Sequence, residues 1–250
     1  MGRADTAQLM DRPAAPPWPL ILCWDAKTAR LPTRPIQPVA RQRQLGVTAP
    51  PWLASGPTDR LFDFCRHMRR LCADIALRSE PLAHVDVTRI LFAVTQARSA
   101  RPHGLQARVT PMRFRGGGLV RRLKGVVYQI QRYFLDGREL LYLVTFCLPR
   151  FLELSFDEKL ITLFHELYHI GPTFDGDLRR HAGRCAIHSH SQRLYDQHMA
   201  GLARDYLAQR PRPALHAFLR LDFSQLHHRH GGVVGTVVPR PKLIPLTPEA

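Results

Sequence analysis

The segment from Ser155 to Pro172 constrains the fold of this chain most, because it specifies both a helix and a metal-binding pattern. Ser155 and Glu158 have the S-x-x-E spacing of a capping box, in which a hydroxyl and a carboxylate satisfy the free amides at a helix start. Apolar residues follow at helical spacing, and Gly171-Pro172 stops the pattern. The sequence therefore predicts an amphipathic helix that runs from Ser155 to Gly171.

This helix contains the run His165-Glu166-Leu167-Tyr168-His169, which has the spacing H-E-x-x-H. Residues i and i+4 lie one turn apart on the same helix face, so the two imidazoles can bind one Zn²⁺. Glu166 lies beside that pair, where it can activate a metal-bound water as a general base. With 13 His in 250 residues the pattern would arise by chance only about 0.016 times. Tyr168 is expected to pack against the core.

A catalytic zinc needs a third protein ligand and an open position. The next glutamate after Glu166 is Glu249, at the far end of the chain, so a downstream glutamate is a poor ligand. The metzincin pattern fails because Pro172 and Asp175 stand where it needs Gly and His. The remaining candidates are Asp175, Asp177, His181, His188 and His190. We favour His181, which follows the turn 174–177. The alternative is that Asp175 or Asp177 is the ligand; otherwise these aspartates, like His188 and His190, are expected to support the ligands or the transition state.

The other elements predict an α+β fold. Apolar residues at helical spacing between Arg60 and Glu80-Pro81 indicate an amphipathic helix. Four runs rich in β-branched and aromatic residues indicate a small, mostly antiparallel sheet, with Asp136-Gly137 as a hairpin turn. These runs are 90–95, 105–114, 126–134 and 140–148. A further helix is expected from Gln192 to Gln209, and a strand over 233–238.

Proline marks the ends of the predicted domain. Residues 1–57 hold ten of the 21 prolines, which favours an extended or flexible basic arm, with 20–24 as a short strand that docks on the core. We assign 58–210 to the catalytic domain and 211–250 to an extension with a proline-rich tail. Five cysteines without a C-x-x-C pair, no apolar run long enough to span a membrane and no leader pattern favour the cytoplasm.

The run from Phe164 to His190 resembles the phage-type metallopeptidases, a zincin group related in layout to the SprT-like (Spartan) proteases. The resemblance is carried by His165-Glu166-Leu167-Tyr168-His169-Ile170, Pro172, the run 174–181, and the motifs at 183–185 and 188–190. It covers roughly 60–240, and within that range the run 104–114 matches less specifically. It implies a minimal zincin-like core in which the strand 140–148 forms an edge that can pair with an extended peptide. The SprT-like pattern has its third histidine a little farther on, before Gly, whereas Ala182 follows His181.

The positive charge of the chain is concentrated before the predicted helix that contains the H-E-x-x-H motif. The formal net charge is +16, and residues 98–150 contain eleven Arg or Lys and two acidic residues. Arg121, Arg122 and Lys124 are suited to phosphate contacts with DNA or RNA, although a solvated basic face would have the same composition.

We therefore expect a zinc-dependent metallopeptidase that acts on protein or peptide substrates, with His165, His169 and His181 as ligands and Glu166 as the general base. The alternative is a basic nucleic-acid-associated protein whose zinc site is structural or whose proteolysis is confined to DNA-bound proteins.

Overall fold

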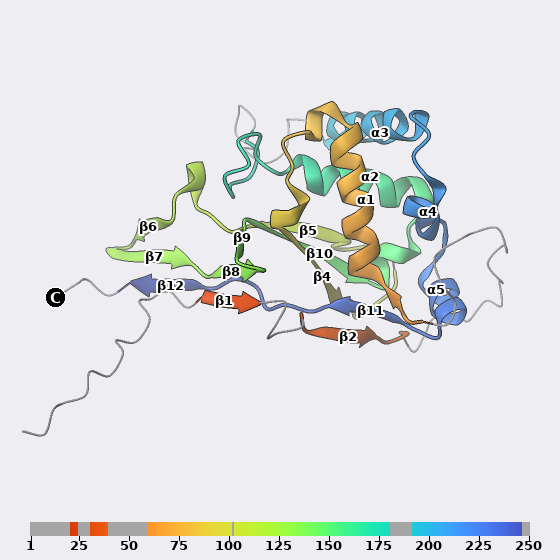
Figure 1. Ribbon diagram of the computed structural model, residues 1–250, viewed down its shortest axis with the longest axis horizontal. Helices are drawn as coiled ribbons and strands as arrows, with labels where there is room; N and C mark the ends of the chain where they lie inside the picture. Colours follow the sequence, from red (N-terminus) through yellow and green to blue (C-terminus); the bar gives the residue numbers. More distant parts are fainter. Residues whose placement is uncertain (1–20, 25–30, 40–59, 102, 181–191, 247–250) are drawn as a thin grey trace, which may run out of the picture.

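The computed structural model describes residues 21–24, 31–39, 60–101, 103–180 and 192–246, and these residues form an α+β fold. The helices are α1 (Phe64–Arg78), α2 (Phe156–Tyr168), α3 (Gln192–Ala208), α4 (Pro213–His216) and α5 (Phe223–His230), with a short 3₁₀ helix η3 (Arg115–Gly117) and others over 80–82, 87–89, 150–153 and 217–220. The strands are β1 (Ile21–Trp24), β2 (Thr33–Ile36), β3 (Phe62–Asp63), β4 (Ile90–Gln96), β5 (Ala107–Pro111), β6 (Val120–Leu123), β7 (Val126–Ile130), β8 (Arg132–Leu135), β9 (Arg138–Leu140), β10 (Tyr142–Leu148), β11 (Val233–Thr236) and β12 (Leu243–Leu246). They pair in four small sheets (Figure 1).

The sheet β4-β10-β5 lies at the centre of the fold. β10 pairs in parallel with β4 and antiparallel with β5, so both of its edges are occupied. The strand that the resemblance placed at an edge is therefore the central strand, and that expectation is wrong. The edge of this sheet beside α2 belongs to β5, which pairs only with β10 in the described parts of the chain. Local sequence could not show this, because β10 is apolar along its whole length and such a run does not reveal its neighbours.

Both faces of this sheet are buried, which explains the nearly continuous apolar runs in β4 and β10. Helices α1, α2 and α3 gather on one face (Figure 1). There the main core is formed, with Phe64 edge-on to Phe146 and Phe151. A smaller cluster covers the other face around Tyr133 and Leu143. The helix face holds the metal-binding motif against the β5 edge.

Segments from both ends of the chain complete the outer sheets. β1 pairs with β8, which confirms the predicted short strand near Trp24. β2 lies in the segment predicted as an arm and pairs with β11, which also pairs with β3. β11 passes close under β4, since a Cβ on Gly235 would lie 2.5 Å from Cγ2 of Val94. β12, from the predicted proline-rich tail, pairs with β7.

Helix predictions agree with the structure more closely than strand predictions. α1 begins at Phe64, after the Asp63 N-cap, and α3 covers the predicted span to within a residue. The run 126–134 is divided at Gln131, because β7 joins β6 and β12 whereas β8 joins β1 and β9. Two short helices were not predicted: α4 begins at Pro213, and α5 ends in the run 227–230, which contains three histidines. Among the described residues, no helix is both long and apolar enough to cross a bilayer.

Candidate metal centre

The metal-binding motif lies in the last turn of α2. The capping box at the start of this helix is present, with Ser155 and Glu158 each accepting from the other's backbone amide. The helix ends earlier than predicted, at Tyr168, and His169 is its C-cap. The carbonyl groups at this end of a helix carry a partial negative charge, and here those of Tyr168 and His169 accept hydrogen bonds from Arg179.

The two imidazoles of the motif converge on one point. Nε2 of His165 lies 2.9 Å from Nε2 of His169, and the ring centroids are 4.5 Å apart. Two nitrogens that bind one tetrahedral zinc at about 2.0–2.1 Å lie roughly 3.3 Å from each other, so a small rotation of either ring accommodates the ion. His169 is buried, whereas the His165 side chain is 21% exposed. The pair therefore faces solvent on the His165 side.

Helix α3 contributes two residues that the sequence analysis did not identify. The Tyr195 ring stacks on His169, with centroids 5.9 Å apart and planes at 22°, and stands edge-on to His165 at 4.9 Å. Oδ1 of Asp196 lies 4.0 Å from Nδ1 of His165, on the ring nitrogen away from His169. A carboxylate at that nitrogen orients a metal-ligating imidazole. The sequence predicted the helix that carries these two residues but not their contacts, because Tyr195 lies 30 positions after His165.

Glu166 is buried beside the imidazole pair. Its Oε2 accepts a hydrogen bond of 2.6 Å from the backbone N–H of Val109, on β5. Burial raises the pKa of Glu166 to about 7, against the Val109 N–H and the positive charge of Arg108, which lower it. A carboxyl group with a pKa near neutrality can both accept and return a proton. This strand contact also shows that the β5 edge faces the motif.

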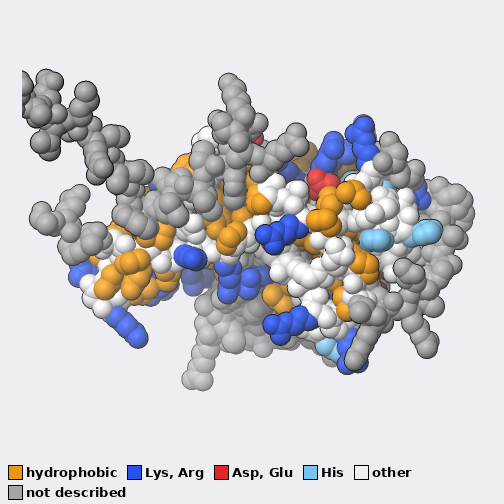
Figure 2. All heavy atoms as spheres, turned by 90° about the horizontal axis from the view of Figure 1, so that it is seen from below, with side chains coloured by type: hydrophobic (Ala, Val, Ile, Leu, Met, Phe, Trp, Pro, Cys, Tyr) orange, Lys and Arg blue, Asp and Glu red, His pale blue; other side chains and the backbone are white. Residues whose placement is uncertain are grey.

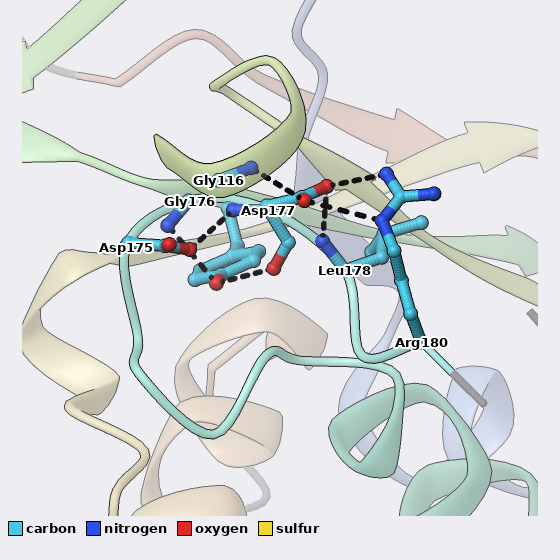
Figure 3. A network of polar contacts seen from close by, with 7 residues as sticks. Gly116, Asp175, Gly176, Asp177, Leu178 and Arg180 are labelled. Carbon is cyan, nitrogen blue, oxygen red and sulfur yellow. Dashed lines mark hydrogen bonds and ion pairs between the residues drawn. The ribbon is translucent and has the colours of Figure 1, made fainter. Parts of the chain in front are cut away.

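The predicted ligand candidates Asp175 and Asp177 have other partners. The Asp177 carboxylate accepts from the backbone of Gly116 and Leu178, at 2.9 and 2.8 Å, and forms an ion pair with Arg180 (Figure 3). Oδ1 of Asp175 accepts from the Asp177 N–H at 3.0 Å. These carboxylates fix the turn after α2 against η3. In the part of the chain that the structure describes, no three His, Cys, Asp or Glu side chains are grouped to hold a metal ion.

The segment after the turn runs back along the metal helix. The Arg179 N–H donates to the carbonyl of His169 at 2.7 Å, and Nε of Arg179 donates to that of Tyr168 at 2.8 Å. The Arg179 guanidinium lies 4.1 Å from the Tyr168 ring centroid, and that ring also packs against the core, as predicted. The predicted third ligand His181 lies outside the described residues. So do His188 and His190.

The predicted phosphate-binding residues lie on a different sheet. Arg121 and Arg122 are exposed on β6, and Lys124 is exposed at the turn into β7. The structure therefore divides the sequence candidates into three groups. They are the histidine pair with Glu166, the carboxylates of the turn after α2, and the basic residues of the β6–β7 hairpin. Comparisons with protein-family models, with curated proteins and with solved structures find no match for this chain, so its function has to be argued from these residues.

Proposed function

We propose that this chain is a zinc-dependent metallopeptidase that hydrolyses peptide bonds in protein or peptide substrates. The observation that carries the proposal is the convergence of two imidazole nitrogens, 2.9 Å apart, with a buried glutamate on the same helical turn. The zincin-like core implied by the resemblance, with α2 packed beside the β5 edge, is part of the same proposal.

The described residues fit a zinc ion in three respects. The two donors are imidazole nitrogens, which zinc binds readily. Asp196 stands at the other nitrogen of His165, as a carboxylate does in many histidine–metal sites. The ligand turn is the C-terminal turn of a helix, which favours a cation. His181 is proposed as the third ligand, and Arg179, two residues earlier, is bonded to the His169 carbonyl.

Each residue has a distinct part in the proposed hydrolysis. When bound, zinc would polarise the scissile carbonyl and acidify a water molecule. Glu166 takes the proton of the attacking water on its carboxylate and returns it to the leaving amine. Asp196, whose Oδ1 lies 4.0 Å from Nδ1 of His165, attracts that imidazole electrostatically without a hydrogen bond. An extended substrate would pair with β5, whose Val109 amide already faces Glu166.

The test measures zinc content and proteolysis of the full-length chain. The wild type should bind about one zinc per chain and cleave an unfolded protein such as casein. Glu166→Gln should keep its zinc and lose cleavage, and His165→Ala should lose both. Asp157→Asn removes an exposed carboxylate from the same helix and should change neither. Absence of bound zinc, or full activity of Glu166→Gln, would overturn the proposal.

The third ligand is tested by metal affinity alone. His181→Ala should weaken zinc binding, whereas Asp175→Asn, which alters a turn carboxylate, should not. Zinc affinity unchanged in His181→Ala would assign the third position to another residue.

A further inference from the structure

The sheet β12-β7-β6 has one packed face and one open face. Residues directly opposite each other on neighbouring strands share a face. Gln129 pairs with Ile244, and both are buried, so their face packs against the protein. On the other face, Tyr128 of the central strand pairs with Arg121 on one side and with Pro245 on the other. Arg121 and Pro245 are exposed and Tyr128 is half-buried, so this face is open to solvent.

The open face combines an aromatic ring with apolar neighbours. Leu243 is 50% exposed and Val126 is 40% exposed, and the pairing places both on the Tyr128 side. Figure 2 shows hydrophobic side chains gathered at the end of the molecule that holds these strands, with Lys and Arg side chains beside them. The face is therefore a platform with an aromatic ring in its middle strand.

The charge around this platform has one sign. Residues 118–130 and 240–246 contain Arg121, Arg122, Lys124, Arg240 and Lys242 and no acidic residue. All five are exposed, and none of the ion pairs found among the described residues involves them. Elsewhere in the basic region, by contrast, Arg113 and Arg132 share Glu139. The structure thus leaves a subset of the basic residues available to a partner.

We propose that this face binds single-stranded nucleic acid, with a base stacked on Tyr128 and phosphates held by Arg121 on the same face and by Lys124 at the hairpin turn, whereas Arg122, which pairs with Val127, lies on the other face. Exposed rings with flanking cations are how proteins bind single strands without sequence preference, because every base has a stacking face and every nucleotide a phosphate. Cations on an edge strand also prevent unwanted pairing of sheets. That role accounts for charge on β6 but not for Tyr128 and Arg121 side by side on the open face.

The hairpin geometry supports a rigid platform. Lys124 and Gly125, at the turn, have φ values of 47° and 86°, and paired positive φ values suit the twist of a two-residue hairpin. The Arg122 guanidinium also donates to the Gly125 carbonyl. This inference does not rest on the proposed peptidase activity, since the platform and the histidine pair lie on different elements.

The experiment measures binding of the full-length protein to a fluorescein-labelled oligothymidine of about 20 nucleotides by fluorescence anisotropy over a salt series. Arg121→Gln and Lys124→Gln together should weaken binding at least tenfold. They should flatten the slope of log K against log salt by about 1.4, because each phosphate contact on a single strand contributes about 0.7. Tyr128→Leu should weaken binding roughly tenfold, and Tyr128→Phe should not.

The matched control removes the same charge from another surface. Arg66 and Arg69 are exposed on α1, and their double replacement by Gln should leave most of the affinity intact. Equal losses in the two double variants would show general charge attraction and overturn the proposal. So would absence of binding, equal affinity of Tyr128→Leu and wild type, or binding to phosphatidylserine vesicles in place of the oligonucleotide. Circular dichroism confirms that each variant is folded, and cleavage of casein should be unaffected.

Discussion

Lys159 allows a quantitative test of how burial and hydrogen bonding compete in this fold. Its side chain is 2% exposed on α2, and Nζ donates to the carbonyls of Leu219 and Leu221 at 2.9 and 2.8 Å. The two carbonyls favour the charged ammonium, whereas removal from water disfavours it. Burial is the larger effect and lowers the pKa of Lys159 from 10.5 to about 8, against the negative charges of Glu153, Asp222 and Glu158, which raise it.

The sign and size of the pH effect follow from this difference. Between pH 8 and 10.5 the unfolded chain keeps the proton that the folded chain has released, so the contribution of Lys159 to stability rises with pH. The difference between the pKa of Lys159 in the unfolded and in the folded chain corresponds to about 3 kcal/mol in the free energy of unfolding, at 1.36 kcal/mol per pKa unit. Groups such as the buried Cys72 thiol, whose pKa burial raises, act in the opposite direction above pH 9.

The assay therefore compares two proteins at each pH. Urea denaturation gives the free energy of unfolding of wild type and Lys159→Met at each pH from 7 to 10. Over this range the wild type should gain about 2–3 kcal/mol relative to the variant, at most about 1.36 kcal/mol per pH unit. Lys124→Met removes an exposed lysine and should follow the wild-type pH dependence. Parallel curves for wild type and Lys159→Met would mean that the carbonyl hydrogen bonds outweigh burial, and would refute the reasoning.

Two further predictions concern single contacts. Glu139→Gln should lower the free energy of unfolding by about 3 kcal/mol, because Arg113 and Arg132 lose their shared carboxylate; a loss under about 1 kcal/mol in urea denaturation would contradict this. Burial raises the pKa of Glu139, but the two arginines outweigh it and hold the pKa low, so the deficit should shrink as pH falls below the usual carboxyl range. Gly176→Ala should lower Tm by about 4–8 °C, since φ is +91° and the new Cβ would lie 2.5 Å from Cγ of Arg113. Gly201→Ala, with open space in α3, should not lower Tm, and equal Tm values for the two variants would refute the strain argument.

The sequence was most informative where structure is set by neighbouring residues. The capping box at Ser155, the H-E-x-x-H spacing and the Asp136-Gly137 hairpin turn depend on residues a few positions apart, and the structure contains all three. The division of one run at Gln131 was not predictable, because both halves are rich in residues that favour strands. What differs is which distant strands they meet.

The missed parts of the site depend on contacts between distant residues. Glu166 meets Val109, 57 residues earlier, and His165 meets Tyr195 and Asp196 on another helix. The turn carboxylates were candidate ligands because a carboxylate can bind zinc, and periodicity cannot tell whether arginine and backbone amides already occupy it. Asp177 shows that local chemistry names the possible partners of a side chain, whereas topology selects among them.

The Asp177 carboxylate makes one mechanical unit of two distant parts of the chain. It accepts from Gly116, which precedes β6, and from Leu178, in the turn that follows α2, although Gly116 and Asp177 are 61 residues apart. Backbone segments that share a buried anchor open together rather than separately. Loss of this carboxylate would therefore free both the turn at 115–117 and the turn that follows α2.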